Sequence, residues 1–548
     1  VIFNDTLITA NFTSIEAWSL KDNKKIWEKS LIKDEVAARL WSGLSFDEKN
    51  KIVYVVTSNS GYLEDAKIKD GGYSSSLLAI NAFDGTIIWQ FQDIRHDIWD
   101  LDVVGPPIIM DIELKNKIVP AIIALTKSGK TLYLDRLTGN PIFPVDYIKT
   151  SEPDVENKNV SSKQLKILRP EPFSDTYFDI HNDVTQISKE KKDYVLFKLR
   201  NVKNGNFLPT SSKYDVAMFG LHGGAEWPGG ALSRDKKILI VPSNRYPWIL
   251  RKNYFDKDES EVLSLSKSNQ IYMNKCVYCH GADLRGARLS ETQGDYYFPS
   301  LVGISRKKET AYLNSVEEFK KNHFYISDAK TIDKKQFKKI LSKVNYGSKK
   351  SELKFYSNFL RWFDRLKRIN ISDSKEIIDK VTQEDLTNLR EFFNQVDNQI
   401  WRNDHNASES FWQLITDQDG MPGSQPPWGN LTAISLVDGK ILWKRPFGYA
   451  YDLIRKKTYE GDMNFGGVMT LGSDIFFANG TRDSNAYAFN LHTGKKIWQE
   501  KMPAPGSAPP MSYMYKGCQY IVFTATGNKY IGDRKRSDTI LGYKLKGC

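Results

Sequence analysis

The sequence contains no run of about 18 apolar residues, so it predicts no transmembrane helix. No basic run alternates with base-stacking aromatic residues in a recognisable module, which argues against nucleic-acid binding despite a net charge of +12. A solvated lysine-rich surface, or docking of an acidic redox partner, explains this charge more simply. The chain begins at Val1, inside a strand-like pattern and without a charged-then-apolar leader, which suggests that a leader and some of the fold lie upstream.

Cysteine is also scarce. Cys276 and Cys279 share one short motif, whereas Cys518 and Cys548 stand alone, and the sequence does not decide whether these two pair. By contrast, 40% of the residues are hydrophobic and 12% are aromatic, which is enough for a substantial core. A chain of 548 residues is too long for one ordinary domain, although a repeat fold can reach this length without splitting.

One pattern recurs five times along the chain. It starts with Ala or Tyr, continues through a short polar turn, and ends with Trp or Phe ten positions after the start. Each copy predicts a strand, a tight turn and a second strand. The spacing between copies suits the blades of a β-propeller, whereas unrelated hairpins in a β-sandwich are the alternative. The copies are residues 17–27, 79–89, 133–143, 433–443 and 488–498.

Between 143 and 443 the repeat is interrupted. Strand patterns give way to helical ones, with apolar residues at three-and-four spacing in 351–369 and a helix start at Thr382 with Asp385. An all-α domain therefore interrupts an all-β propeller. The predicted domains are residues 1–255 (first part of the propeller), 256–400 (the insert) and 401–548 (second part of the propeller).

The insert contains Cys276-Val-Tyr-Cys279-His280. A zinc site needs a second ligand pair, and none follows at metal-binding spacing. A thioredoxin-like pair needs a βαβ context, whereas the surroundings here are helical. The remaining interpretation is c-type haem attachment, with both thiols bound to the haem and His280 on the iron. Residues 256–400 resemble a small class I cytochrome c.

The insert departs from that family in its second iron ligand. No Met lies between Met273 and Met421, so the usual Met ligand is missing. His323 is a candidate, although a lone surface His is the blander interpretation, and an open or Lys-ligated iron is a further alternative. A bis-His or open iron has a lower potential than a His/Met iron.

Residues 39–250 and 421–548 resemble quinoprotein dehydrogenases that use pyrroloquinoline quinone (PQQ). The absence of tandem cysteines favours the sugar-oxidising branch or a divergent one. Family members have eight blades and this chain shows about six, which fits missing N-terminal blades. The motifs that carry the resemblance are 96–102 (His-Asp-Ile-Trp-Asp-Leu-Asp), 126–129 (Thr-Lys-Ser-Gly), 223–230 (Gly-Gly-Ala-Glu-Trp-Pro-Gly-Gly), 426–429 (Pro-Pro-Trp-Gly), 464–467 (Asn-Phe-Gly-Gly) and 519–523 (Gln-Tyr-Ile-Val-Phe).

The resemblance implies a role for several polar residues. Asp100 is the base that takes the substrate hydroxyl proton, and Lys127 contacts the quinone oxygens, where a cation stabilises developing negative charge. Asn59, Asp100 and Asp102 are candidate ligands of Ca²⁺ or a similar divalent or lanthanide ion, whose preferred donors are oxygens. Asp97 is structural. The alternatives are an ordinary turn Asp at 100 and a solvated turn Lys at 127.

Three further residues, Glu226, Trp227 and Trp428, are expected to line the PQQ cavity, although Trp428 could simply pack between blades. The resemblance then implies a periplasmic dehydrogenase. It oxidises a sugar or alcohol with PQQ and passes electrons through haem c to an external cytochrome or quinone. Membrane association through the upstream segment stays open. The alternatives are a non-enzymatic propeller scaffold that carries a haem domain, and a damaged enzyme.

Overall fold

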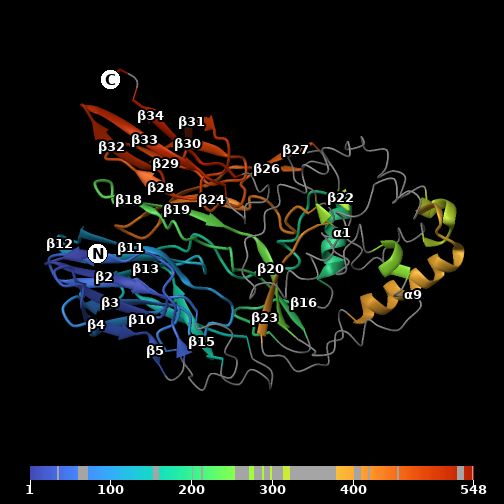
Figure 1. Ribbon diagram of the computed structural model, residues 1–548, viewed down its shortest axis with the longest axis horizontal. Helices are drawn as coiled ribbons and strands as arrows, with labels where there is room; N and C mark the ends of the chain where they lie inside the picture. Colours follow the sequence, from blue (N-terminus) through green and yellow to red (C-terminus); the bar gives the residue numbers. More distant parts are fainter. Residues whose placement is uncertain are drawn as a thin grey trace.

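The computed structural model describes most of the two propeller segments and short parts of the insert. The described residues are 1–33, 36–59, 72–151, 160–199, 202–210, 214–253, 271–276, 287–288, 297–298, 313–320, 378–399, 409–417, 420–452, 456–527, 536–545 and 547–548. Antiparallel sheets dominate, and the sheets that contain the N- and C-terminal strands lie on the same side of the molecule in Figure 1. The predicted mostly-β, propeller-like class is therefore observed, whereas the count of eight blades stays a prediction.

The sheets of the first half follow one another along the chain, and most pair neighbouring strands. The first sheet comprises β1 (Ile2–Phe3), β2 (Thr6–Asn11), β3 (Ser14–Ser19) and β4 (Lys25–Ser30). The second comprises β7 (Ser45–Asp47), β8 (Ile52–Val56), β9 (Ser76–Asn81) and β10 (Ile87–Gln92). The third comprises β11 (Val103–Leu114), β12 (Lys117–Thr126) and β13 (Thr131–Asp135). Smaller pairs are β5 (Ile32–Lys33) with β6 (Val36–Ala37) and β14 (Val145–Lys149) with β15 (Lys163–Ile167).

Two sheets join strands from both sides of the insert. In one, β16 (Val202–Lys203), β17 (Asp215–Phe219), β20 (Pro247–Asn253) and β23 (Glu409–Leu414) pair in that order. In the other, the order is β18 (Ala231–Ser233), β19 (Ile238–Asn244), β24 (Gly429–Ser435) and β25 (Ile441–Pro446). The paired strands β20 and β23 therefore lead into and out of residues 254–408. The exact domain boundaries at 255 and 400 stay predictions.

The last sheets follow in sequence order. They are β26 (Tyr449–Asp452) with β27 (Lys457–Glu460), then β28 (Val468–Thr470), β29 (Ile475–Ala478), β30 (Asn485–Asn490) and β31 (Lys496–Lys501), and finally β32 (Met511–Tyr515), β33 (Cys518–Ala525) and β34 (Thr539–Lys544). Among the described residues, no helix is both long and apolar enough to cross a membrane.

Four copies of the sequence repeat form the predicted hairpins. In each, the first and last residues of the repeat face one another across the two strands, next to a register shift. The cross-strand pairs are Ala17 with Trp27, Ala79 with Trp89, Ala433 with Trp443 and Ala488 with Trp498. The constant ten-residue interval is therefore the length of one hairpin with one bulge.

The repeat tryptophans join successive sheets. The Trp89 indole nitrogen donates to the Arg136 carbonyl at 3.0 Å, and Trp443 donates to the Leu491 carbonyl at 2.9 Å. Gly139 and Gly494, in the turns of the following repeats, have positive φ, and a Cβ there would lie within 3 Å of these rings. The turn glycine therefore supplies both the left-handed conformation and the space for the ring.

The copy at 133–143 is the exception, because it forms no hairpin of paired strands. Strand β13 ends at Asp135, and only an isolated bridge joins Leu134 to Pro141. Asp135 N–H donates to the Asn140 carbonyl at 2.8 Å and Ile142 N–H to the Tyr133 carbonyl at 2.9 Å, so the turn closes but the pairing stops at this bridge. The predicted turn is therefore present at this copy, whereas the predicted second strand is not.

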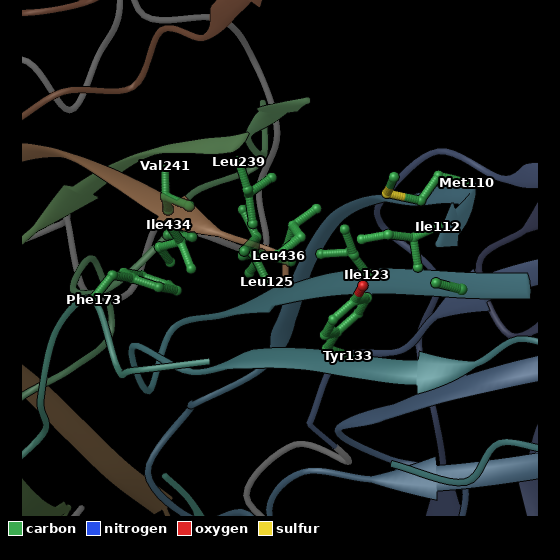
Figure 2. Close-up of a cluster of buried hydrophobic side chains, with 13 residues drawn as sticks. Met110, Ile112, Ile123, Leu125, Tyr133, Phe173, Leu239, Val241, Ile434 and Leu436 are labelled. Atoms are coloured by element: carbon green, nitrogen blue, oxygen red, sulfur yellow. The ribbon is translucent and has the colours of Figure 1, made fainter. Parts of the chain in front are cut away.

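An apolar cluster between the β11–β13 sheet and the β18–β19–β24–β25 sheet leads towards the candidate site. Figure 2 shows side chains of both sheets meeting there, with Ile123 and Leu125 on β12 and Leu239 and Val241 on β19. These side chains are at most 5% exposed. Lys127 follows β12 directly, so this packing fixes the backbone from which its side chain projects.

The described part of the insert contains helix α9 (Gln383–Gln399) and a π-helical turn (Tyr272–Cys276). The Thr382 hydroxyl oxygen accepts from the Asp385 N–H at 3.1 Å, and the Asp385 carboxylate accepts from the Thr382 N–H at 2.8 Å, which confirms the predicted helix start. Tyr272 stacks on Phe392 of α9 with ring centroids 4.8 Å apart. The short pair β21 (Ala287–Arg288) and β22 (Tyr297–Phe298) departs from an all-α insert. The helix expected at 351–369 lies outside the described residues.

The first half of the chain also contains helix α1 (Lys189–Lys198), which lies apart from the sheets of the first half in Figure 1. Ser188 caps this helix, and its side chain accepts from the Lys191 N–H at 3.2 Å.

Candidate active site

Four segments that are separate in sequence meet around Lys127. They are the end of β8, the loop between β10 and β11, the turn between β12 and β13, and the loop between β17 and β18. The Lys127 N–H donates to the Asp102 carbonyl at 3.0 Å, and the Ala225 N–H donates to the Thr126 carbonyl at 3.2 Å. Backbone hydrogen bonds therefore hold the last three of these segments together independently of the side chains.

Lys127 lies between two aspartates. Its Nζ atom is 3.1 Å from Asp100 Oδ1 and 3.0 Å from Asp102 Oδ2. The side chains of Lys127, Asp100 and Asp102 are only 7%, 16% and 5% exposed. Burial alone would lower the pKa of Lys127, but the charges of both aspartates outweigh it and hold this pKa above its usual value. A permanently charged ammonium therefore lies in the site.

Asn59 joins the same cluster. Its backbone N–H donates to Asp102 Oδ1 at 2.7 Å, and its side-chain amide donates to Asp100 Oδ1 at 3.2 Å. The structure thus brings together Asn59, Asp100, Asp102 and Lys127, the four polar residues that the sequence analysis assigned to the metal and the chemistry.

Asp97 holds the loop that presents Asp100. Its carboxylate accepts from the N–H groups of Trp99 and Leu101 and from the Ser75 hydroxyl at 2.7 Å. Asp100 has a φ of 58°, a left-handed conformation that is costly for a residue with a Cβ. A loop that is over-determined by buried hydrogen bonds can hold such strain, which is commonly found at functional sites.

Two carboxyl groups of this loop, those of Asp97 and Asp100, have raised pKa values. Burial raises the pKa of Asp100 to about 8; Lys127 opposes this rise, and the neighbouring Asp102 and Asp97 add to it. Burial, followed by the charge of Asp102, raises the pKa of Asp97 to about 7. One lysine therefore does not balance the carboxylates around it, and a second cation beside them would favour their charged forms.

Glu226 is the fourth carboxyl group near Lys127. It is 4% exposed, and among the described residues neither of its oxygens accepts a well-formed hydrogen bond. The Asn244 amide donates to the Asn464 carbonyl, and it also lies near enough to Glu226 to lower the pKa of that carboxyl. Burial raises the pKa of Glu226 well above its usual value, although Lys127 opposes it. A buried polar group without a partner is rare, and it marks a place where a ligand can bind.

The loop of Glu226 can approach Lys127 because Gly224 has no side chain. Gly224 has a φ of +62°, and a Cβ there would lie 2.2 Å from the Lys127 carbonyl oxygen. Any larger residue would push the 223–230 loop away from the turn after β12.

Aromatic rings form the other wall of the site. Lys127 Nζ lies 5.1 Å from the centroid of the Trp41 ring, within the range of a cation–π interaction. Trp41 meets Trp227 edge to face at 5.8 Å, and Trp227 is 39% exposed. Trp41 was missed by the sequence analysis, because it lies outside the repeat pattern and only tertiary contact brings it to Lys127.

Trp428 has a different environment from Trp227. It is fully buried, donates to the Ser424 carbonyl at 2.9 Å, and packs with Met421, Met463 and Phe465. The ring centroid of Phe465 lies 6.0 Å from that of Trp227, so this buried cluster packs against the aromatic wall. These contacts describe Trp428 as a packing residue, which is the second of the two roles that the sequence analysis gave it.

The haem residues are only partly described. Cys276 ends the π-helical turn and packs against the small apolar cluster of Tyr272 and Phe392. Cys279, His280 and His323 lie outside the described residues, so covalent haem and both iron ligands stay predictions.

The side chains of this site have the chemistry that a planar quinone and an accompanying cation need. Aromatic rings, a buried cation and an unsatisfied buried carboxyl suit a flat polar molecule. Asn59, Asp100 and Asp102 offer the oxygen donors that Ca²⁺ prefers. Within the described ranges, however, no three His, Cys, Asp or Glu side chains converge on one metal position. A cation here must therefore take part of its coordination from the Asn59 amide, the bound quinone or water.

Comparison with known proteins places the chain in a family. A family model described as the β-propeller domain of glucose, ethanol and alcohol dehydrogenases that use PQQ matches residues 13–282 and 364–521. The chain is 23% identical to quinoprotein glucose dehydrogenase A of Acinetobacter calcoaceticus (92% of this chain, 49% of that protein). It is 24% identical to the glycerol dehydrogenase large subunit of Gluconobacter thailandicus (90% and 52%).

Among solved structures, the quinohemoprotein alcohol dehydrogenase of Comamonas testosteroni superposes with a TM-score of 0.49 at 13% identity, covering 99% of this chain and 58% of that one. The chain spans about half the length of the curated relatives it matches. The matched stretches contain Asn59, Asp100, Asp102, Lys127 and Glu226. The chain belongs to the family of PQQ-dependent β-propeller proteins.

Proposed function

We propose that this chain is a PQQ-dependent dehydrogenase that oxidises a sugar or an alcohol. Electrons then pass through a haem c bound within residues 256–400 to an external cytochrome or quinone. The observation that carries the proposal is the buried cluster in which Asp100 and Asp102 bracket Lys127, with Asn59 bonded to both aspartates. A purely structural scaffold does not need four buried polar groups brought together from three separate segments, one of them in a left-handed backbone conformation.

In this proposal Asp100 takes the proton of the substrate hydroxyl. PQQ supplies the chemistry of accepting two electrons and a hydrogen from the substrate carbon. Burial raises the pKa of Asp100 to about 8, which disfavours the carboxylate in the protein without a bound cation. A divalent cation beside Asn59, Asp100 and Asp102 favours the carboxylate, which makes Asp100 competent as a base.

Lys127 keeps its charge in the buried site and stabilises negative charge on an oxygen placed beside it. Trp41 and Trp227 provide ring faces against which a flat molecule can pack. Asp97 maintains the backbone of the loop and therefore the position of Asp100. In this proposal Asp100 removes the proton, and Lys127 stabilises the negative charge.

The route out of the site is proposed to run through Cys276, Cys279 and His280 as the haem-binding residues. Support comes from the motif itself and from the topology, because β20 and β23 lead directly into and out of the residues that contain it. Haem c attachment and PQQ enzymes both belong to the bacterial periplasm, which is the proposed location. The metal is proposed to be Ca²⁺ or a related divalent or lanthanide ion.

The test uses the full chain, matured with haem and reconstituted with PQQ and Ca²⁺. Glucose, glycerol and simple alcohols are mixed with it in a stopped-flow spectrometer, and the haem α-band is recorded. We expect one substrate class to raise this band, because the two redox centres are coupled. If dithionite reduces the haem while no substrate does, the dehydrogenase proposal is wrong and the propeller is a scaffold.

A further inference from the structure

The two cysteines outside the haem motif lie together at the end of the fold. Cys518 is the first residue of β33, and its thiol donates to the Cys548 carbonyl at 3.3 Å. The backbone after β34 turns back towards this strand, because Leu545 N–H donates to the Gln519 carbonyl at 3.1 Å and Cys548 N–H donates to the Leu545 carbonyl at 3.4 Å. Thirty residues of sequence therefore close into a loop whose two ends are in contact.

The Cys518 thiol lies against the backbone of Cys548. Hydrogen bonding with Cys548, followed by burial, raises the pKa of the Cys518 thiol. Cys518 is 9% exposed, whereas Cys548 is exposed. Cys548 also follows the last strand, so its backbone can adjust to disulfide geometry without disturbing the ladder between β33 and β34.

We propose that Cys518 and Cys548 are a site of oxidative cross-linking, forming an intramolecular disulfide that fastens the segment after β34 to the start of β33. The oxidant is a disulfide compound, either a thiol–disulfide oxidoreductase or oxidised glutathione. The exposed Cys548 thiolate attacks it, forming a mixed disulfide and releasing one thiol. The Cys518 thiolate then attacks the Cys548 sulfur and releases the second thiol.

In the whole reaction the protein loses two S–H groups and gains one S–S bond, while the disulfide oxidant is reduced to two thiols. The order of attack follows exposure, because only Cys548 is accessible to a bulky oxidant, while Cys518 is placed to resolve the mixed disulfide. The cross-link does not depend on bound PQQ or haem, so it stands apart from the proposed enzymatic function.

The test equilibrates the full chain in a glutathione redox buffer, blocks free thiols with an alkylating reagent, and digests the protein with trypsin. Cleavage after Lys516, Lys529 and Lys546 places Cys518 in peptide 517–529 and Cys548 in the peptide that begins at Gly547. We expect mass spectrometry to find these peptides joined, with a mass two hydrogens below their sum. Adding a reductant should lower the melting temperature of the wild type by several degrees, because the closed loop restrains the unfolded chain.

Two variants separate this bond from other thiol chemistry. Cys548→Ser, which changes an exposed residue, should leave peptide 517–529 alkylated and make the melting temperature insensitive to reductant. The paired variant Cys276→Ser with Cys279→Ser should keep the joined peptide. Alkylation of both thiols in the oxidised wild type, bonding to glutathione alone, or linkage of Cys518 to Cys276 overturns the proposal.

Discussion

Two lysines of this protein are buried between pairs of aspartates, in two different regions. Lys127 lies 3.1 and 3.0 Å from Asp100 and Asp102. Lys191, on helix α1, lies 2.7 and 3.0 Å from Asp417 and Asp452. The distances are nearly the same, yet only the first arrangement has the character of a ligand site. The difference lies in the backbone and in the neighbouring groups.

The Lys191 group joins three distant pieces of chain. Asp417 follows the insert and also accepts from the Met421 N–H at 2.9 Å, whereas Asp452 belongs to β26. All three side chains are at most 1% exposed, and Lys191 sits in the regular first turn of a capped helix. Such a group stabilises one arrangement of helix, loop and strand.

The Lys127 group has opposite properties. Asp100 has left-handed backbone geometry, Glu226 nearby accepts no well-formed hydrogen bond among the described residues, and Trp227 is 39% exposed. Strain and an unsatisfied carboxyl cost stability and serve a bound ligand. The comparison teaches that the same ion-pair geometry is structural or functional according to what surrounds it.

The largest effect is expected from Asp100→Asn, which removes the base and keeps the shape of the side chain. Substrate-dependent dye reduction should fall by about 10²- to 10⁴-fold, as for loss of a general base, with no loss of bound haem. The matched control is Asp452→Asn in the other group, which should lower stability while each folded molecule keeps its turnover. Undiminished turnover in Asp100→Asn would remove Asp100 from the mechanism.

The Lys191 group should respond in stability. Lys191→Met leaves two carboxylates buried without their cation, so the free energy of unfolding should fall by about 3–5 kcal/mol. Urea denaturation followed by fluorescence measures this change. Lys189→Met is the control on the same helix, because its side chain is 92% exposed and its ion pair with Asp193 contributes less than about 1 kcal/mol. Equal effects of the two substitutions would contradict a structural role for the buried group.

Sequence reasoning found one of these lysines and missed the other, for a physical reason. Lys127, Asp100 and Asn59 lie in short motifs that resemble a family, so their meeting could be predicted. Lys191 meets Asp417 and Asp452 only through the packing of α1, and no local spacing encodes that contact. Trp41 was missed likewise.

The fold shows the same division between local and tertiary information. The ten-residue repeat encodes a hairpin, and four of its five copies form one, because a bulged hairpin is a local structure. The fifth copy forms its turn, but its pairing stops at the isolated bridge between Leu134 and Pro141. The pairing of β19 with β24 across the insert depends on long-range contact.

Lys127→Met tests the functional group in a second way. The substitution keeps the length of the side chain and removes the charge that stabilises a developing oxyanion, so turnover should fall by about 10²- to 10³-fold. Lys127→Arg keeps the charge and should retain more activity and more PQQ affinity than Lys127→Met. Titration calorimetry with PQQ separates lost binding from lost turnover, and equal behaviour of the two variants would exclude a role for the charge.

The smallest and most specific effect concerns Glu226 in the protein without PQQ or metal. Burial raises the pKa of this group well above the usual value of 4.5, so the folded protein holds its proton after the unfolded chain has released it. Above pH 4.5 the unfolded state therefore binds fewer protons, and Glu226 makes stability fall as pH rises, by about 1.4 kcal/mol for each unit of pKa difference.

Glu226→Gln removes the titrating group and keeps its shape, so the variant should lose this part of the pH slope and gain stability relative to the wild type as pH increases. Urea unfolding at several pH values measures the slope, and Glu113→Gln on an exposed part of β11 is the control. Parallel slopes in wild type and Glu226→Gln would mean that Glu226 is solvated or paired in solution. That result would also weaken the distinction between the two lysine groups, because the unsatisfied carboxyl is what sets the Lys127 region apart.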